Sequence, residues 1–76
     1  MAERLPRVTG AAILRALERG GLRRVTQVGS HVHLKHPSRP GRVTVPAHRG
    51  KTVRLGTLNR ILEQAGVMVD EFKALL

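Results

Sequence analysis

The chain contains no cysteine, tryptophan or tyrosine, and it has a single phenylalanine, Phe72. Without cysteine, neither disulfides nor thiolate metal sites can form. Modules that bind single-stranded nucleic acid by stacking need several exposed aromatic rings, and one phenylalanine cannot supply them. Any nucleic-acid binding therefore has to rely on phosphate contacts and on shape.

Acidic residues are scarce and are absent from the whole stretch between Arg19 and Leu62. The 76 residues carry 14 Lys and Arg against five Asp and Glu, a formal net charge of +9. Such a block of one sign attracts polyanions, so we expect a nucleic-acid partner, although a solvated basic surface could have the same composition. Because the block lacks carboxylates, a nuclease that uses two metal ions is excluded there, and we expect neither a metal nor another cofactor.

No apolar run approaches the roughly 20 residues that a membrane span requires. Residues 1–6 also lack the apolar core of a signal peptide. These absences predict a cytoplasmic protein with no membrane contact. The length predicts one domain over residues 1–76 with a modest core.

The pattern of apolar residues predicts two main helices and three strands in the order α-β-β-β-α. After a short arm over residues 1–8, Thr9 is a candidate N-cap for a helix over 10–19, which Gly20-Gly21 ends. Strands are predicted over 22–28, 31–36 and 42–46. A second helix capped by Thr57 runs to Gly66, and residues 70–76 add a turn or two. We expect an α+β fold with a three-stranded antiparallel sheet and both helices on one face. This is the layout of a double-stranded-RNA-binding domain.

The stretch from Gly29 to Pro37 holds three of the four histidines and alternates with period two. A strand that buries Val32 and Leu34 turns His31, His33 and Lys35 to solvent. As a general base, His31 could take the proton from a ribose 2′-hydroxyl, with positive charge at the phosphorus from neighbouring cations. The candidate cations are Lys35, Arg42, Arg49 and Lys51.

The remaining histidines leave alternatives open. His31 and His33 share a face and could chelate a cation. A closed site needs four ligands, but the chain has no cysteine and His36 falls on the opposite face of the strand. His48 could protonate the leaving 5′-oxygen or simply be a loop residue. His36 precedes Pro37, and we expect it to be half-buried at the end of the strand.

Taken together, several short motifs resemble the HicA family of toxin mRNA interferases. They are Gly29-Ser30-His31, His36-Pro37, Val43-Thr44-Val45-Pro46, His48, Gly50-Lys51, Gly56-Thr57-Leu58, Ile61-Leu62 and Gln64-Ala65-Gly66. The resemblance implies a toxin that cleaves mRNA and a HicB-like antitoxin protein as its partner. It also places the catalytic role on His31, the histidine that follows the Gly-Ser pair. The chain departs from the family at Val32, where a second histidine is common, and at Met68, where a Ser or Thr often caps the last helix.

We therefore expect an endoribonuclease in which His31 is catalytic. The RNA is expected to contact Ser30, His33, Lys35, Arg42, His48, Arg49 and Lys51. Two other functions fit the same residues: a non-catalytic RNA-binding module, and a domain that docks a protein on its open sheet face.

Overall fold

Three helices and three strands make up the fold in a computed structural model that describes residues 5–76. The predicted order is confirmed, and the last turns form a third short helix. In chain order the elements are α1 (Gly10–Arg19), β1 (Arg23–Val28), β2 (His31–Lys35), β3 (Val43–Pro46), α2 (Leu55–Ala65) and α3 (Val69–Leu75).

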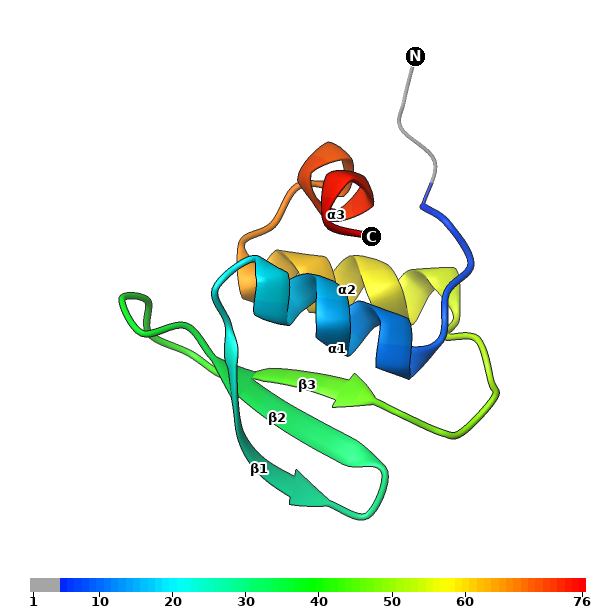
Figure 1. Cartoon of the computed structure of the whole chain (residues 1–76), viewed down its shortest axis with the longest axis horizontal. Coiled ribbons are helices and arrows are strands. Elements are labelled where there is room, and N and C mark those ends of the chain that lie inside the picture. The colour runs from blue at the N-terminus through cyan, green and yellow to red at the C-terminus, as the bar shows by residue number, and fades with distance from the viewer. Residues whose placement is uncertain (1–4) are drawn as a thin grey trace.

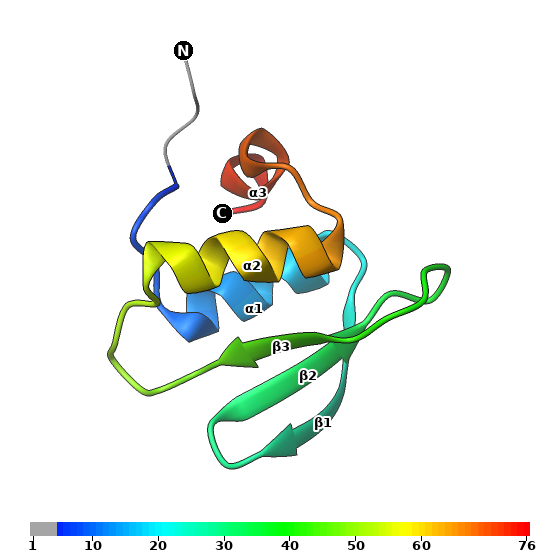
Figure 2. The same cartoon turned by 180° about the vertical axis from the view of Figure 1, so that it is seen from behind.

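The three strands form an antiparallel sheet with β2 in the centre. Helices α1 and α2 lie side by side over one face, and α3 lies beyond them on the side away from the strands (Figure 1; seen from behind in Figure 2). The predicted α+β arrangement, with two helices on one face of the sheet, is confirmed. The other face of the sheet is left uncovered.

The core is apolar and lies between the sheet and the helices. From β2 it receives Val32 and Leu34, and Phe72 of α3 closes it from the far side with no exposed surface. Helices α1 and α2 contribute residues spaced three or four apart, as expected for an amphipathic helix. These are Ile13, Leu14, Ala16, Leu17, Leu58, Ile61, Leu62 and Ala65.

Helix α1 begins as predicted, because the side chain of Thr9 accepts a hydrogen bond from the Ala12 N–H at 3.2 Å. Glycine disfavours a helix, but Gly10 at the first helical residue has a packing role. A Cβ at Gly10 would clash with the carbonyl oxygen of Pro46 and would lie 2.6 Å from the Cα of Ala47. Only glycine lets the helix come this close to the end of β3.

The prediction that Thr57 caps α2 is wrong. The helix begins three residues earlier, at Leu55, with Arg54 at the N-cap and no side-chain hydrogen bond to the first turn. The predicted end is correct, since Gly66 takes the left-handed conformation at φ 69°. In α3, Glu71 accepts a hydrogen bond from the Met68 N–H at 3.1 Å and so helps to cap the helix.

The N-terminal arm was predicted for residues 1–8, of which residues 1–4 lie outside the described part of the chain. Leu5 and Val8 pack against the core. The Val53 N–H donates to the Val8 carbonyl at 2.8 Å, and Thr9 pairs with Thr52. The arm therefore anchors the long loop between β3 and α2.

Strand β1 begins at Arg23, one residue later than predicted, and all six of its residues are exposed. A bulge between Arg24 and Thr26 interrupts its pairing with β2. Leu22, just before the strand, is the residue that enters the core. The helices thus cover β2 and β3, while β1 forms an uncovered edge.

Within residues 5–76, no helix has the length and apolar character needed to cross a membrane.

Two glycines near helix starts should respond in opposite ways to the same substitution. Gly10→Ala should lower the free energy of unfolding by about 1–3 kcal/mol, since the new methyl group meets backbone. Gly56→Ala should raise it by up to about 1 kcal/mol, because a Cβ there meets nothing within 4 Å and alanine favours the helix. Urea denaturation of both variants measures this, and a shift of the same sign in both would contradict the account.

Candidate functional site

His31 is the first residue of the central strand and is exposed on the uncovered face of the sheet. The turn before it is tight because Gly29 adopts φ 59°, a conformation that favours glycine. His31 is paired on both sides, with Val28 of β1 and with Pro46 of β3. Its backbone is thus fixed, while its imidazole makes no hydrogen bond to any other residue of 5–76.

Ser30 joins the start of β2 to the loop that follows β3. Its carbonyl accepts a hydrogen bond from the Ala47 N–H at 2.7 Å. Its hydroxyl lies 3.4 Å from Nε2 of His48, within hydrogen-bonding distance. The structure therefore brings together three residues singled out in the sequence: Ser30, His31 and His48.

His33 lies on the same face as His31, nearer the middle of the sheet, and is half-buried. It is opposite Thr26 on one side and Thr44 on the other. Its Nδ1 lies 2.9 Å from Oγ1 of Thr44, which holds the ring by a hydrogen bond. Sequence analysis gave no role to Thr44, although alternation along β3 puts it on this face.

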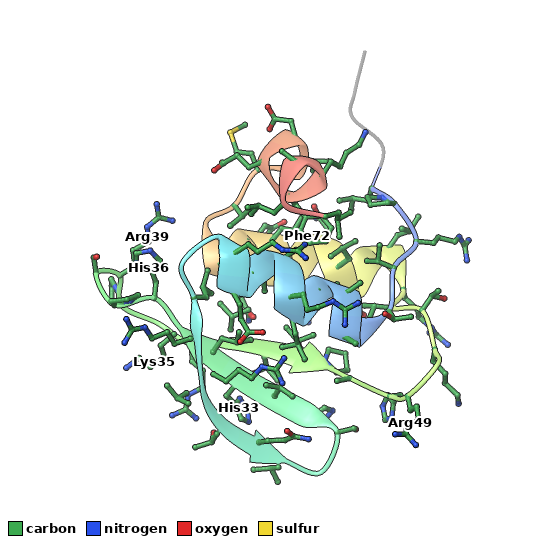
Figure 3. All side chains as sticks on the ribbon, in the orientation of Figure 1. His33, Lys35, His36, Arg39, Arg49 and Phe72 are labelled. Carbon is green, nitrogen blue, oxygen red and sulfur yellow. The ribbon has the colours of Figure 1, made fainter. Side chains whose placement is uncertain are left out.

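Lys35 and Arg42 lie at the other end of the sheet from His31. Lys35 pairs with Arg23, and it lies four positions after His31 along β2, which is about 13 Å. Figure 3 shows Lys35 at one end, Arg49 in the loop at the other and His33 between them. The predicted cations therefore form two groups, and only the loop group lies at the His31 end.

His36 lies just past the end of β2 and is half-buried, as predicted. Its Nδ1 accepts a hydrogen bond from the Ser38 N–H at 3.1 Å, which holds the turn after the strand. This histidine contributes to the hairpin and not to the open face.

The loop over residues 47–54 exposes Arg49 and Lys51. It turns on itself through a hydrogen bond from the Lys51 N–H to the His48 carbonyl at 3.2 Å. A depression of about 190 Å³ lies between this loop and the start of α2. Its lining consists of Pro46, His48, Lys51, Thr52, Val53, Arg54 and Thr57. Arg54 was not among the predicted contacts; the earlier start of α2 brings it to the depression.

Positive and negative charges are separated in the fold. Every carboxylate side chain of residues 5–76 belongs to a helix: Glu18, Glu63, Asp70 and Glu71. One side-chain ion pair is described, between Arg24 and Glu18 at 3.0 Å. The open sheet face and the 47–54 loop therefore carry cations without nearby carboxylates. No group of three potential metal ligands occurs among residues 5–76.

These features define a small α+β domain whose uncovered face carries histidines and unneutralised cations. A family model described as the HicA toxin of bacterial toxin-antitoxin systems matches residues 10–67. The chain therefore belongs to the HicA toxin family, and this membership implies an antitoxin partner. A comparison with curated proteins found no match.

The hydrogen bond between His33 and Thr44 can be tested with two matched threonines. Thr44→Val should be less stable than Thr26→Val by about 1 kcal/mol, because only Thr44 bonds the imidazole. Both substitutions keep a β-branched residue opposite His33, so strand propensity cancels between them. Equal stabilities in urea denaturation would show that Thr44 does not hold the ring.

Proposed function

We propose that this HicA family member is an mRNA interferase, an endoribonuclease that cleaves mRNA without a metal ion. The observation that carries the proposal is the position of His31. Its backbone is fixed by pairing on both sides, and its imidazole is exposed on the open face and free of partners among residues 5–76. Imidazole groups change protonation near neutral pH, which suits them to take and give protons.

In the proposed reaction, His31 takes the proton from a ribose 2′-hydroxyl. The 2′-oxygen forms a bond to the adjacent phosphorus, and the bond from phosphorus to the 5′-oxygen breaks. The 5′-oxygen takes a proton from a general acid as it leaves, so the products are a 2′,3′-cyclic phosphate and a 5′-hydroxyl. Because the nucleophile belongs to the substrate, the enzyme needs no nucleophilic side chain, and DNA cannot react.

The negative charge on the phosphorane is stabilised by cations of the 47–54 loop. Arg49 and Lys51 belong to the same end of the sheet as His31, whereas Lys35 lies about 13 Å along the strand. We therefore assign Arg49 and Lys51 to the scissile phosphate, and Lys35 and Arg42 to phosphates further along the RNA. Ser30, His33 and His48 complete the proposed contact surface.

The toxin would act in the cytoplasm, where mRNA is translated. A HicB-like antitoxin would neutralise it by covering the open face and His31. Metal-assisted chemistry has no support from the residues, because the carboxylates of residues 5–76 lie on the helices and not on this face.

His31→Ala should abolish RNA cleavage and leave RNA binding largely intact. Loss of a general base lowers the rate by about 10²–10⁴-fold, and the backbone pairing at His31 does not depend on its side chain. Gel analysis of cleavage, filter binding of the same RNA and growth on induction measure the three effects. His36→Ala is the matched control, since His36 lies off the open face, and it should retain cleavage.

Two results would contradict the proposal. If partner-free wild-type protein binds RNA but leaves it intact, the protein is an RNA-binding module. If His31→Ala cleaves RNA at the wild-type rate, His31 is not the general base.

A further inference from the structure

We propose that His48 is the general acid that protonates the leaving 5′-oxygen. The inference rests on the proposed function, because it assigns the second proton transfer of the same reaction. An alkoxide is a poor leaving group, so a reaction that begins with a base needs an acid on the other side of the phosphorus.

The backbone brings His48 to the His31 end of the sheet. His31 pairs with Pro46, and Ser30 accepts the Ala47 N–H at 2.7 Å. His48 is the next residue along, and its ring lies within 3.4 Å of the Ser30 hydroxyl. The base and the acid thus come from different segments, the start of β2 and the loop after β3.

The contact with Ser30 also decides which ring nitrogen gives the proton. Nε2 lies against the Ser30 hydroxyl, while Nδ1 of His48 has no hydrogen-bond partner within residues 5–76. In the imidazolium form, Nε2–H donates to Ser30 and Nδ1–H points to the substrate. As the bond from phosphorus to the 5′-oxygen breaks, that oxygen takes the Nδ1 proton and leaves as a hydroxyl. Ser30 is then a positioning residue for His48.

His48 lies at a concave, cationic surface. It lines the depression of about 190 Å³ together with Lys51, Arg54 and Thr57. The fragment that departs with the 5′-oxygen can lie there with its next phosphate near Lys51 and Arg54. Base and acid would then stand on opposite sides of the scissile phosphate.

His33 is the rival for the same role. It lies on the face of His31, about 6.6 Å along the strand. Its Nδ1 is bonded to Thr44 and its ring is half-buried in the middle of the sheet. A ring held in this way suits a fixed contact with RNA, and Figure 3 shows His33 away from Arg49 of the loop.

A substrate with sulfur in place of the bridging 5′-oxygen distinguishes a general acid from a residue that only binds RNA or supports the fold. A thiolate leaves without a proton, because a thiol ionises near pH 8.5. With ordinary RNA, His48→Ala and His48→Gln should slow cleavage by about 10²–10⁴-fold. With the 5′-thio substrate, both variants should cleave at close to the wild-type rate. On ordinary RNA, the fall in wild-type rate at high pH should disappear in both variants, since no acid is left to deprotonate.

Two controls use histidines of the same face. His31→Ala should be slow on both substrates, because the base is still needed. His33→Ala should lose the same factor on both substrates, as expected of a binding residue.

Ser30→Ala tests the positioning role of the serine. It should lose activity on ordinary RNA and regain it with the 5′-thio substrate, which a merely structural role would not produce.

The other outcomes would contradict either the assignment of His48 or the proposed function. Wild-type rates for both His48 variants on ordinary RNA would overturn the assignment, as would equal losses on the two substrates. Rescue by sulfur in His33→Ala, and not in the His48 variants, would transfer the role to His33. If the wild type cleaves neither substrate, the proposed function itself fails.

Discussion

The alternation of side chains along β2 is the constraint on which both the core and the candidate site depend. Val32 and Leu34 must point to the helices, because the core has no other contribution from the central strand. The residues between them must then point away. Since a slip of one residue would exchange the two faces, burial of two aliphatic side chains fixes the exposure of His31 and His33.

The register that holds these residues is set from both sides. The turn at Gly29 fixes β1 against β2, and the pairing of His31 with Pro46 fixes β3. That second pairing brings the 47–54 loop to the start of β2. Gly10 adds a third restraint, since α1 comes within contact of Pro46 and Ala47. One end of the sheet is thereby well anchored, and it is the end that carries His31 and His48.

The separation of positive from negative side chains suits the uncovered face of the sheet to binding a polyanion. Within residues 5–76 the side-chain carboxylates lie on the helices, whereas Lys35, Arg49 and Lys51 lie on the sheet and its loop. Repulsion among these cations opposes folding, and a bound polyanion relieves it. A toxin whose partner covers this face would also hide its most repulsive surface.

Local patterns in the sequence predicted most of the fold. The bounds of α1, the two faces of β2 and the stop at Gly66 follow from periodicity and from glycine conformation. The sequence did not reveal features that depend on distant residues. Thr57 resembles a cap, but anchoring of the loop by Val8 lets α2 begin earlier, at Leu55. The role of Gly10 depends on the approach of β3, which no local pattern records.

The sequence predicted only part of the candidate site, because local patterns do not record contacts between distant residues. Alternation placed His31, His33 and Lys35 on one face. It could not show that Ser30 meets His48 or that Thr44 holds His33, because these contacts need the strand register. Nor could it divide the cations into two groups at opposite ends of the sheet.

The chemistry of the RNA ends tests the central claim most directly. Partner-free wild-type protein should cleave a defined RNA in the presence of EDTA. Its products should carry 2′,3′-cyclic phosphates and 5′-hydroxyls, which kinase labelling and mass spectrometry detect. Products with 5′-phosphates, or cleavage that stops when EDTA is added, would contradict a reaction carried by histidines and the ribose hydroxyl.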